Sequence, residues 1–262
     1  MPITIAAWNV NSVKARLERA VEWVREARPD VLCLQELKCT EEAFPRLEFE
    51  DLGYNCAIDG QKTYNGVAVL SRFPIEETVR GLPGGDGDDH ARYLEAVIAT
   101  PGRPIRVASI YAPNGNPAPG PKFDYKLSWL DRLIARVREL LTYEEVLALA
   151  GDYNIIPTPE DCDNPPAWMG DALFFPESRA KYRELLNLGL TGAFEQADGR
   201  PHQYTFWDYQ AGSWQRNHGI RIDHILLSPE AADRLKSFTI HHAERAKDRP
   251  SDHVPVVATL EV

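Results

Sequence analysis

Short apolar runs, each ended by a polar residue or a turn, constrain the fold of this chain more than any other feature. The runs lie at residues 3–9, 30–36, 65–72, 92–100, 105–113, 147–156, 220–228, 237–244 and 254–262. Runs of this length, separated by Gly- and Pro-rich turns such as residues 81–89, are typical of β-strands. The pattern predicts a strand-rich chain.

Three other stretches show the spacing of amphipathic helices, at residues 12–27, 122–141 and 176–189. Ser12 is the expected N-cap of the first, and Gly189 the expected end of the last. Helices and strands do not alternate strictly, so we expect an α/β sandwich of mixed sheets covered by helices rather than a doubly wound parallel sheet. No repeat or low-complexity linker is visible, and we predict one domain spanning residues 1–262.

Composition narrows the function only slightly. A formal net charge of −10 argues against a non-specific nucleic-acid coat protein, but it permits one local basic face and fits carboxylates gathered around a metal. The four cysteines lack zinc-site spacing. The first residues do not resemble a signal peptide, and no apolar stretch is long enough to span a bilayer. We therefore expect a cytoplasmic protein without membrane contact.

Polar residues cluster where the predicted strands end or begin. The members are Asn9, Glu36, Tyr111, Asp152, Asn154 and Asp223, with Asp252 and His253 just before the last run. Since one strand starts beside the end of its antiparallel neighbour, these groups can meet at one rim if the strand order permits. Asn9, Asn154 or Asp223 taken singly is explained as well by turn capping. Glu36 has little use in a turn, which favours a functional role.

The segment "GDYN" at residues 151–154 raises a more local question, because a charge is costly in a buried strand. If the extended conformation persists, Asp152 and Asn154 point the same way and Tyr153 points oppositely, into packing.

The chemistry of the set is coherent. Glu36 with other oxygen donors suits Mg²⁺, which takes one or two carboxylates and leaves positions for phosphate oxygens. His253 can donate to a phosphate oxygen while Asp223 fixes its tautomer. Asp152 remains to orient or deprotonate a water, with Asn154 holding the geometry. These parts suit hydrolysis of a phosphodiester.

The motifs "WNVNS", "PDVLCLQELK", "GVAVLSR", "YAPNG", "GDYNIIPT", "GIRIDHILLS" and "SDHVPV" occur in the order seen in the exonuclease III family of DNA-repair nucleases, which the chain resembles from about residue 3 to residue 262. The resemblance implies one catalytic domain of the endonuclease/exonuclease/phosphatase type, built as a four-layer sandwich of two mixed β-sheets face to face with helices outside. It also implies a metal-dependent enzyme that cuts duplex DNA 5′ to abasic sites and processes 3′ ends, both as a 3′–5′ exonuclease and by removing blocking groups.

The same resemblance assigns roles to the rim residues. Glu36 corresponds to the principal ligand of Mg²⁺, or of Mn²⁺ in its place. The other residues implied close to that ion are Asn9, Asp252, Asp152 and Asn154. Asp152 and the Asp223–His253 pair are both candidates for the general base, and Tyr111 corresponds to a hydroxyl that contacts the phosphate or the leaving oxygen.

An extruded, baseless sugar needs an apolar pocket. The resemblance places Phe206 and Ile220 in its wall with Trp207 adjacent, although ordinary core packing is the favoured interpretation of Trp207. The candidates for gripping the DNA backbone are Arg92, Asn114, Lys122, Lys126, Arg216, Asn217 and Arg221, of which Arg92 and Asn114 are the favoured ones. The loop at residues 157–174 departs from the family pattern.

The expected partner is duplex DNA with abasic sites or blocked 3′ ends, bound by a monomer. Two alternatives remain at this stage. One is a superfamily phosphodiesterase or phosphatase that acts on a non-DNA phosphoester. The other is a non-catalytic DNA-binding homologue, against which the complete set of rim residues argues.

Overall fold

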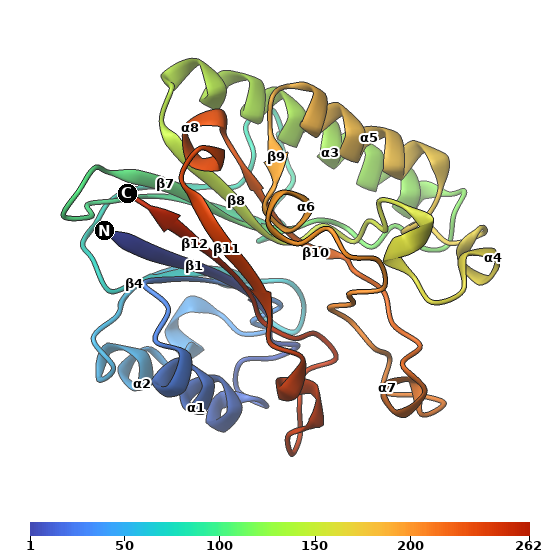
Figure 1. The fold of residues 1–262 in the computed structure, drawn as a ribbon, viewed down its shortest axis with the longest axis horizontal. Coiled ribbons are helices and arrows are strands. Elements are labelled where there is room, and N and C mark those ends of the chain that lie inside the picture. The colour runs from blue at the N-terminus through green and yellow to red at the C-terminus, as the bar shows by residue number, and fades with distance from the viewer.

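The computed structural model describes residues 1–262, and its strands form two six-stranded sheets packed face to face (Figure 1). The first sheet has the order β11-β12-β1-β2-β4-β3, and the second has the order β5-β6-β7-β8-β10-β9. The strands of the first sheet are β1 (Pro2–Asn9), β2 (Val31–Gln35), β3 (Asn55–Asp59), β4 (Val67–Ser71), β11 (Leu235–Ile240) and β12 (Val256–Glu261). Those of the second are β5 (Ile75–Arg80), β6 (Tyr93–Ile98), β7 (Ile105–Tyr111), β8 (Val146–Asp152), β9 (Thr191–Gly192) and β10 (Asp223–Leu227).

Both sheets are mixed, as predicted. β1 pairs in parallel with β2, and β7 pairs in parallel with β8, whereas the other strand pairs are antiparallel. Each sheet therefore has one parallel pair near its centre. The central strands are covered on both faces, which explains why they read as nearly continuous apolar runs.

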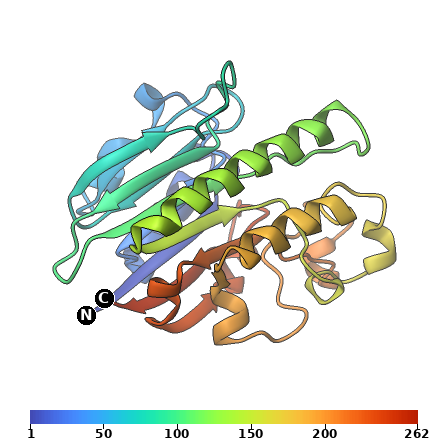
Figure 2. The ribbon, with the colours of Figure 1, turned by 90° about the horizontal axis from the view of Figure 1, so that it is seen from above.

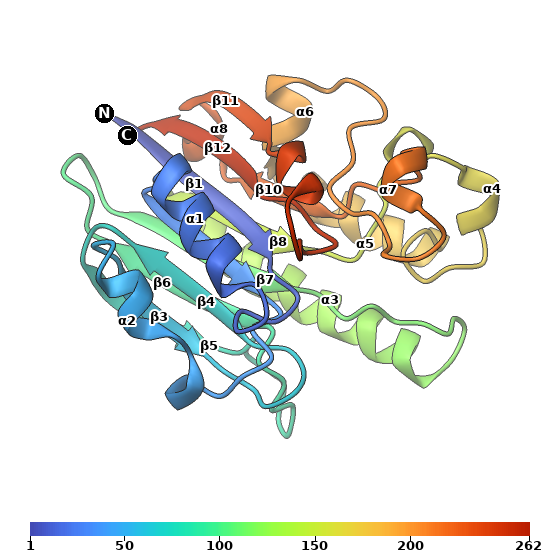
Figure 3. The same cartoon turned by 90° about the horizontal axis from the view of Figure 1, so that it is seen from below.

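The helices cover the outer faces. They are α1 (Leu17–Ala27), α2 (Arg46–Glu50), α3 (Pro121–Leu140), α4 (Pro165–Trp168), α5 (Pro176–Asn187), α6 (Ala193–Ala197), α7 (Ser213–Arg216) and α8 (Pro229–Ala232). α3 and α5 lie side by side over the second sheet (Figure 2), and α1 and α2 lie over the first (Figure 3). The result is the predicted four-layer sandwich.

Three apolar clusters hold these layers together. One lies between the sheets and joins small and β-branched residues such as Ile5 and Val69 to Val107 and Ala148. A second packs α1 onto the first sheet, where the Trp8 and Trp23 rings meet edge to face at 5.5 Å. A third packs α3 and α5 onto the second sheet.

Element boundaries differ from prediction where the backbone turns left-handed. α1 begins at Leu17 and not beside Ser12, because Ser12 has a φ of 83° and Arg16 occupies the N-cap position. α3 and α5 match the predicted helices, and Gly189 follows α5 with a φ of 116°.

The apolar runs did not predict β3 and β5, the outermost strands at one side of the sandwich. Both are half exposed and carry polar residues on their open faces, so neither shows an apolar run. The predicted strand at 237–244 ends at Ile240 and continues as a 3₁₀ turn. The two termini lie together, with the Val262 amide donating to the Met1 carbonyl at 2.9 Å. None of the helices has the length and apolar character needed to cross a bilayer.

Candidate active site

Strand register brings the predicted rim residues to one end of the sandwich. Asn9, the last residue of β1, pairs with Gln35, and Glu36 follows directly. In the second sheet, Asp152 at the end of β8 pairs with Tyr111 on one side and with Asp223 on the other. The two sheets face each other here, so the ends of β2 and β8 present their carboxylates to a common space.

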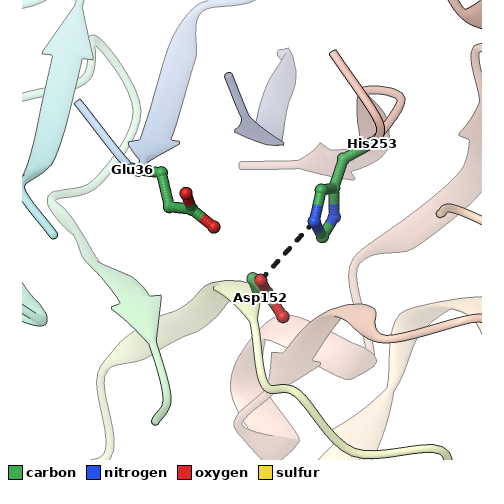
Figure 4. Close-up of side chains that lie close together, drawn as sticks. All are labelled: Glu36, Asp152 and His253. Atoms are coloured by element: carbon green, nitrogen blue, oxygen red, sulfur yellow. Dashed lines mark ion pairs between the residues drawn. The ribbon is translucent and has the colours of Figure 1, made fainter. Parts of the chain in front are cut away.

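Glu36, Asp152 and His253 form the centre of this site. One side-chain atom of each lies within 4.8 Å of the others, and Figure 4 shows all three side chains pointing to one point from three different segments. The His253 Nε2 atom lies 3.8 Å from Asp152 Oδ2. Asp152 and His253 are almost completely buried, whereas Glu36 is partly exposed.

Asn9 joins the two carboxylates. Its Nδ2 group donates to Glu36 Oε1 at 2.9 Å and to Asp152 Oδ2 at 3.0 Å. Its Oδ1 atom accepts from the Asn11 amide at 3.0 Å. In this arrangement the amide nitrogen, and not the oxygen, faces the centre, so Asn9 orients the carboxylates.

His253 is held by a second buried acid. Its Nδ1 atom lies 2.9 Å from Asp223 Oδ2, and both side chains are buried. Burial alone would lower the pKa of His253, but the Asp223 carboxylate outweighs it and raises that pKa to about 10. The ring is therefore an imidazolium at neutral pH, with Nδ1–H donating to Asp223 and Nε2–H directed at the centre.

For Asp152, in contrast to His253, burial determines the direction in which the pKa moves. Burial raises its pKa to about 7, with the His253 charge opposing the rise and the Asp223 carboxylate adding to it. The Asn154 amide donates to Asp152 Oδ1 at 2.8 Å, which limits the rise. A carboxylate that titrates near neutrality is suited to accepting a proton at physiological pH.

The Asp152 and Asn154 side chains do come together, but the predicted cause, an extended strand that points both the same way, is wrong. The extended strand ends at Asp152, and Asn154 has a φ of 49°. The two side chains are brought together by a tight turn in which Asp152 accepts from the Asn154 backbone. Tyr153 does point away, as predicted, and is fully buried with its hydroxyl donating to the Leu149 carbonyl at 3.0 Å.

Glu36 also sits on a left-handed backbone, with a φ of 53°. Lys38 Nζ lies 2.8 Å from Glu36 Oε2. Burial would raise the pKa of Glu36, but hydrogen bonds from Asn9 and Lys38 lower it below the usual range. Glu36 is thus an ionised oxygen donor.

Tyr111, the last residue of β7, lies beside the Glu36 and Asp152 carboxylates. Burial raises its pKa well above the usual value, and the Glu36 and Asp152 carboxylates add to the rise, so its hydroxyl stays protonated. The Arg92 guanidinium lies over its ring at 4.8 Å and donates to its backbone carbonyl at 3.3 Å. Asn114 donates from Nδ2 to Asn154 Oδ1 at 3.4 Å.

Asp252 lies beside the centre but outside the group of three. Its Oδ1 atom accepts from Asn11 Nδ2 at 3.1 Å. Asn11 in turn accepts from Lys38 Nζ at 2.5 Å, so it links Asp252 to the Glu36 side of the site. The sequence reading missed Asn11, although it stands only two residues after Asn9 in "WNVNS".

A cavity of about 430 Å³ opens beside Phe206, and its lining combines hydrophobic side chains with polar ones that include Asp163, Asp171, Asp208 and His218. Phe206 and Ile220 line it, as the sequence indicated, and the Phe206 ring meets the His253 ring edge to face at 5.0 Å. Trp168, from the loop that departs from the family pattern, also lines it and was not anticipated. The placement of Trp207 at the pocket is wrong, because it is buried in a small core with Tyr204 and Val254.

Two of the cations expected on the DNA-binding surface are instead buried. Arg221 is 3% exposed and pairs with Asp161 at 2.7 Å and Glu195 at 2.6 Å. Lys126 is 0% exposed and donates only to backbone carbonyls. Neither can reach a DNA phosphate.

The donor set fits a hard divalent cation. Glu36 and Asp152 supply carboxylate oxygens within 4.8 Å of each other. Asp223 Oδ1 is buried and has no hydrogen-bond partner. His253 contributes no ligand while Nε2 is protonated, so the residues offered are oxygen donors, the kind that Mg²⁺ prefers.

Comparison with known proteins gives a consistent picture. A profile of the Endonuclease/Exonuclease/phosphatase family matches residues 6–253. Exodeoxyribonuclease III of Haemophilus influenzae is 32% identical over 264 residues, covering 96% of this chain and 97% of that protein. The structure of the 3′ phosphatase NExo from Neisseria, bound to a product DNA hairpin, matches with a TM-score of 0.95 and 38% identity, covering 99% of this chain and 100% of that one. An AP endonuclease from Archaeoglobus fulgidus matches with a TM-score of 0.94 and 33% identity, covering 99% of this chain and 100% of that one.

Proposed function

The chain belongs to the endonuclease/exonuclease/phosphatase family and is a metal-dependent DNA-repair nuclease of the exodeoxyribonuclease III type, and we propose that it uses Mg²⁺ to cut duplex DNA 5′ to abasic sites and to process 3′ ends. The observation that supports this most is the buried Asp223–His253 pair, whose imidazole contacts Asp152 in the carboxylate group and Phe206 in the cavity wall. That layout suits a phosphodiester at the carboxylates whose adjacent sugar enters the cavity.

His253 binds and polarises the phosphate. Because Asp223 accepts from Nδ1, the proton on Nε2 is directed at a phosphate oxygen and stabilises the negative charge that develops there. An imidazolium with a pKa of about 10 has no free lone pair to accept a proton at neutral pH. The Asp223–His253 pair is therefore a poor general base.

Asp152 is the better base. Its carboxylate titrates near neutrality and faces the His253 Nε2 atom, so a water between Asp152 and the phosphate can lose its proton to Asp152 Oδ2. Asn154 keeps that carboxylate in place through its backbone amide, and the Asn154 side chain is fixed by a 2.9 Å hydrogen bond to the Ala112 carbonyl. The protonated Tyr111 hydroxyl is proposed to donate to the phosphate or the leaving oxygen.

Glu36 would be the principal ligand of the cation, with Asn9 orienting its carboxylate and Asp152, Asp252 and Asn154 beside it. When bound there, Mg²⁺ would supply positive charge to offset the negative charge of the phosphate and the leaving group. Mn²⁺ shares the preference for oxygen ligands and is proposed as a substitute.

The cavity is proposed to receive the baseless sugar, with Phe206, Ile220 and Trp168 as its apolar wall. Arg92 and Asn114 are proposed to contact the DNA backbone. We further propose that residues 1–262 act as one catalytic domain and as a monomer, because one chain supplies every group of the site. All four cysteines are free thiols, which supports a reducing cytoplasm.

The test uses one duplex with a single abasic-site analogue, an undamaged duplex, and a nicked duplex with a 3′-phosphate. Each is incubated with Mg²⁺, with Mn²⁺ or with chelator, and the products are resolved by length. We expect cleavage 5′ to the lesion and release of the 3′-phosphate only with metal. Intact substrates under every condition would refute the proposal.

Of the two alternative functions, neither is favoured by an observation on this chain. A phosphatase for non-DNA phosphoesters predicts a pocket that binds an anionic headgroup, whereas the cavity beside Phe206 is lined by three carboxylates, Asp163, Asp171 and Asp208, which would repel one. A non-catalytic homologue predicts gaps in the acid–imidazole set, whereas Asp152, Asp223 and His253 are in contact.

A further inference from the structure

Lys126 is a fully buried lysine next to the active site, in the second turn of α3. Lysine is almost never fully buried unless its charge is paired. Here the ammonium makes three hydrogen bonds, and all three go to backbone carbonyl oxygens. The acceptors are Asn114 at 3.1 Å, Asn154 at 2.5 Å and Ala172 at 3.3 Å. Three N–H donors meet three acceptors, so the group is satisfied without a carboxylate.

The three acceptors belong to separate segments that carry site residues. Asn114 lies in the loop between β7 and α3, Asn154 follows β8, and Ala172 lies in the loop that precedes α5. The Asn114 and Asn154 side chains contact each other at 3.4 Å. Asp171, next to Ala172, lines the cavity that Phe206 and Ile220 also line. The Lys126 ammonium therefore hydrogen-bonds to three segments at once: the turn that holds Asp152, the loop of Asn114 and the segment next to Asp171 in the cavity wall.

The surrounding chain is shaped to admit this side chain. Gly115 has a φ of 91°, and a Cβ atom there would lie 2.7 Å from Lys126 Cδ and 3.2 Å from Ala172 Cβ. Asn154 holds a left-handed backbone, which costs on the order of 1 kcal/mol and persists only where neighbouring contacts impose it. The Lys126 hydrogen bond to the Asn154 carbonyl is one of those contacts.

The geometry favours the charged form of the side chain. Burial lowers the pKa of Lys126 to about 7, and the Asp152 and Asp171 carboxylates oppose that change. A neutral amine has two N–H donors and a lone pair, so it would leave one of the three carbonyls facing the lone pair. The carbonyl arrangement is complementary to an ammonium.

We propose that Lys126 is a positioning residue for the nuclease reaction, holding the Asn114, Asn154 and Ala172 carbonyls so that Asp152 keeps its alignment with His253. This proposal rests on the proposed function, which assigns the proton transfer to Asp152. Lys126 touches no reacting atom. Its effect on turnover passes through the 152–154 turn.

The test compares Lys126→Met with Arg106→Met. Methionine keeps an unbranched chain of similar length but removes the donors. Arg106 is also a buried cation, 8% exposed and paired with Glu95 and Glu145, but it stands near the start of β7, at the other end of that strand from Tyr111. Both variants should lose stability. Only Lys126→Met should lower kcat, by roughly 10- to 100-fold with little change in KM, because a misplaced base costs turnover rather than DNA binding.

Hydrogen exchange supplies a readout that does not depend on activity. In Lys126→Met, backbone amides of residues 112–116, 153–156 and 171–173 should exchange faster together, while those of β1 and β12 stay protected. In Arg106→Met these three segments should exchange as in the wild type. If the wild type does not cut DNA, the proposed function fails, and the exchange pattern still decides whether Lys126 holds the three segments.

Two results would overturn the proposal. One is a folded Lys126→Met protein whose kcat is no lower than that of Arg106→Met. The other is exchange that stays unchanged in the three segments. If Lys126→Met does not fold, Gly115→Ala replaces it, because the added methyl pushes on the Lys126 side chain and leaves the charge in place. The same drop in kcat and the same exchange pattern are then expected, and wild-type values for both would refute the role.

Discussion

Replacing Asp152 with asparagine should stabilise the metal-free protein, and the gain should grow as the pH rises from 5 to 8. The reason is that the fold holds Asp152 where ionisation is unfavourable. Its pKa is raised from an ordinary value of 3.8 to about 7, first by burial and then by the Asp223 carboxylate. A raised carboxyl pKa contributes stability that is present below pH 3.8 and is lost as the pH rises through about 7. The wild type therefore loses stability across this window and Asp152→Asn does not.

The magnitude follows from linkage. One pKa unit corresponds to about 1.4 kcal/mol, so the raised pKa of Asp152 destabilises the folded protein by roughly 4 kcal/mol at pH 8 and by roughly 2 kcal/mol at pH 5. The asparagine amide also loses the hydrogen bond from Asn9, worth about 1 kcal/mol, but this loss is the same at both pH values. It cancels when the two pH values are compared. His253, with a pKa of about 10, stays protonated throughout. The advantage of the variant should thus increase by about 2–3 kcal/mol between pH 5 and pH 8.

The assay is urea unfolding followed by tryptophan fluorescence, with chelator present, at pH 5, 6, 7 and 8. Asp86→Asn is the control, since Asp86 is an exposed carboxylate outside the site and its replacement should leave the wild-type pH dependence unchanged. Added Mg²⁺ should raise the stability of the wild type more than that of Asp152→Asn, because the cation stabilises the ionised carboxylate. An Asp152→Asn advantage that is independent of pH would show that burial of this carboxylate does not oppose folding.

Three further variants test the other assignments. Glu36→Gln should weaken Mg²⁺ binding by at least about 10-fold in calorimetry with a similar unfolding midpoint, because its side chain is only partly buried; unchanged affinity would remove Glu36 from the ligand set. His253→Ala should lower kcat by about 100- to 1,000-fold while DNA affinity, measured by fluorescence anisotropy, stays near normal, and near-normal turnover would mean that its role is misassigned. Phe206→Ala should reduce the preference for abasic over undamaged duplex by about 10-fold in kcat/KM, since the aromatic wall is lost; an unchanged ratio would place the sugar elsewhere.

The polar residues at the strand ends could be predicted because their placement depends only on the length of each apolar run and on where that run stops. A short apolar run fixes a buried strand, and a carboxylate directly after the run must lie at the sheet edge. Glu36 and Asp152 follow this rule in two different sheets. Which strands become neighbours could not be read from the runs, because pairing depends on contacts between residues far apart in sequence.

Local geometry at the site was less predictable. The meeting of Asp152 and Asn154 depends on a left-handed residue that breaks the strand period, and asparagine tolerates that conformation more readily than most residues. Core packing was the favoured interpretation of Trp207 and is what the structure shows, but no sequence pattern distinguishes Phe206 at the pocket from a core residue, because an aromatic side chain suits both. β3 and β5 were missed since a half-exposed edge strand needs no apolar run.

Lys126 was assigned to the surface by residue type, although the helical period contains the contrary signal. It lies three residues after Phe123 and four before Leu130, within the buried stripe of α3. A lysine on an apolar stripe must either leave the stripe or find acceptors, and here it finds carbonyls supplied by loops distant in sequence.

The charges of this site are tolerated because they are placed where the sheets end. Asp152 and Asp223 are paired across β8 and β10. If this pair lay in the middle of the strands, the two carboxylates would have no hydrogen-bond donors besides the backbone. At the strand ends, each carboxylate meets a side chain from outside its own sheet: Asn9 of β1 for Asp152, and His253, just before β12, for Asp223. One Asp223 oxygen still lacks a partner, and Asp152 still resists ionisation. This residual excess of negative charge is what a divalent cation and a proton taken from water would relieve, so the features that weaken the metal-free fold are the ones that favour the reaction.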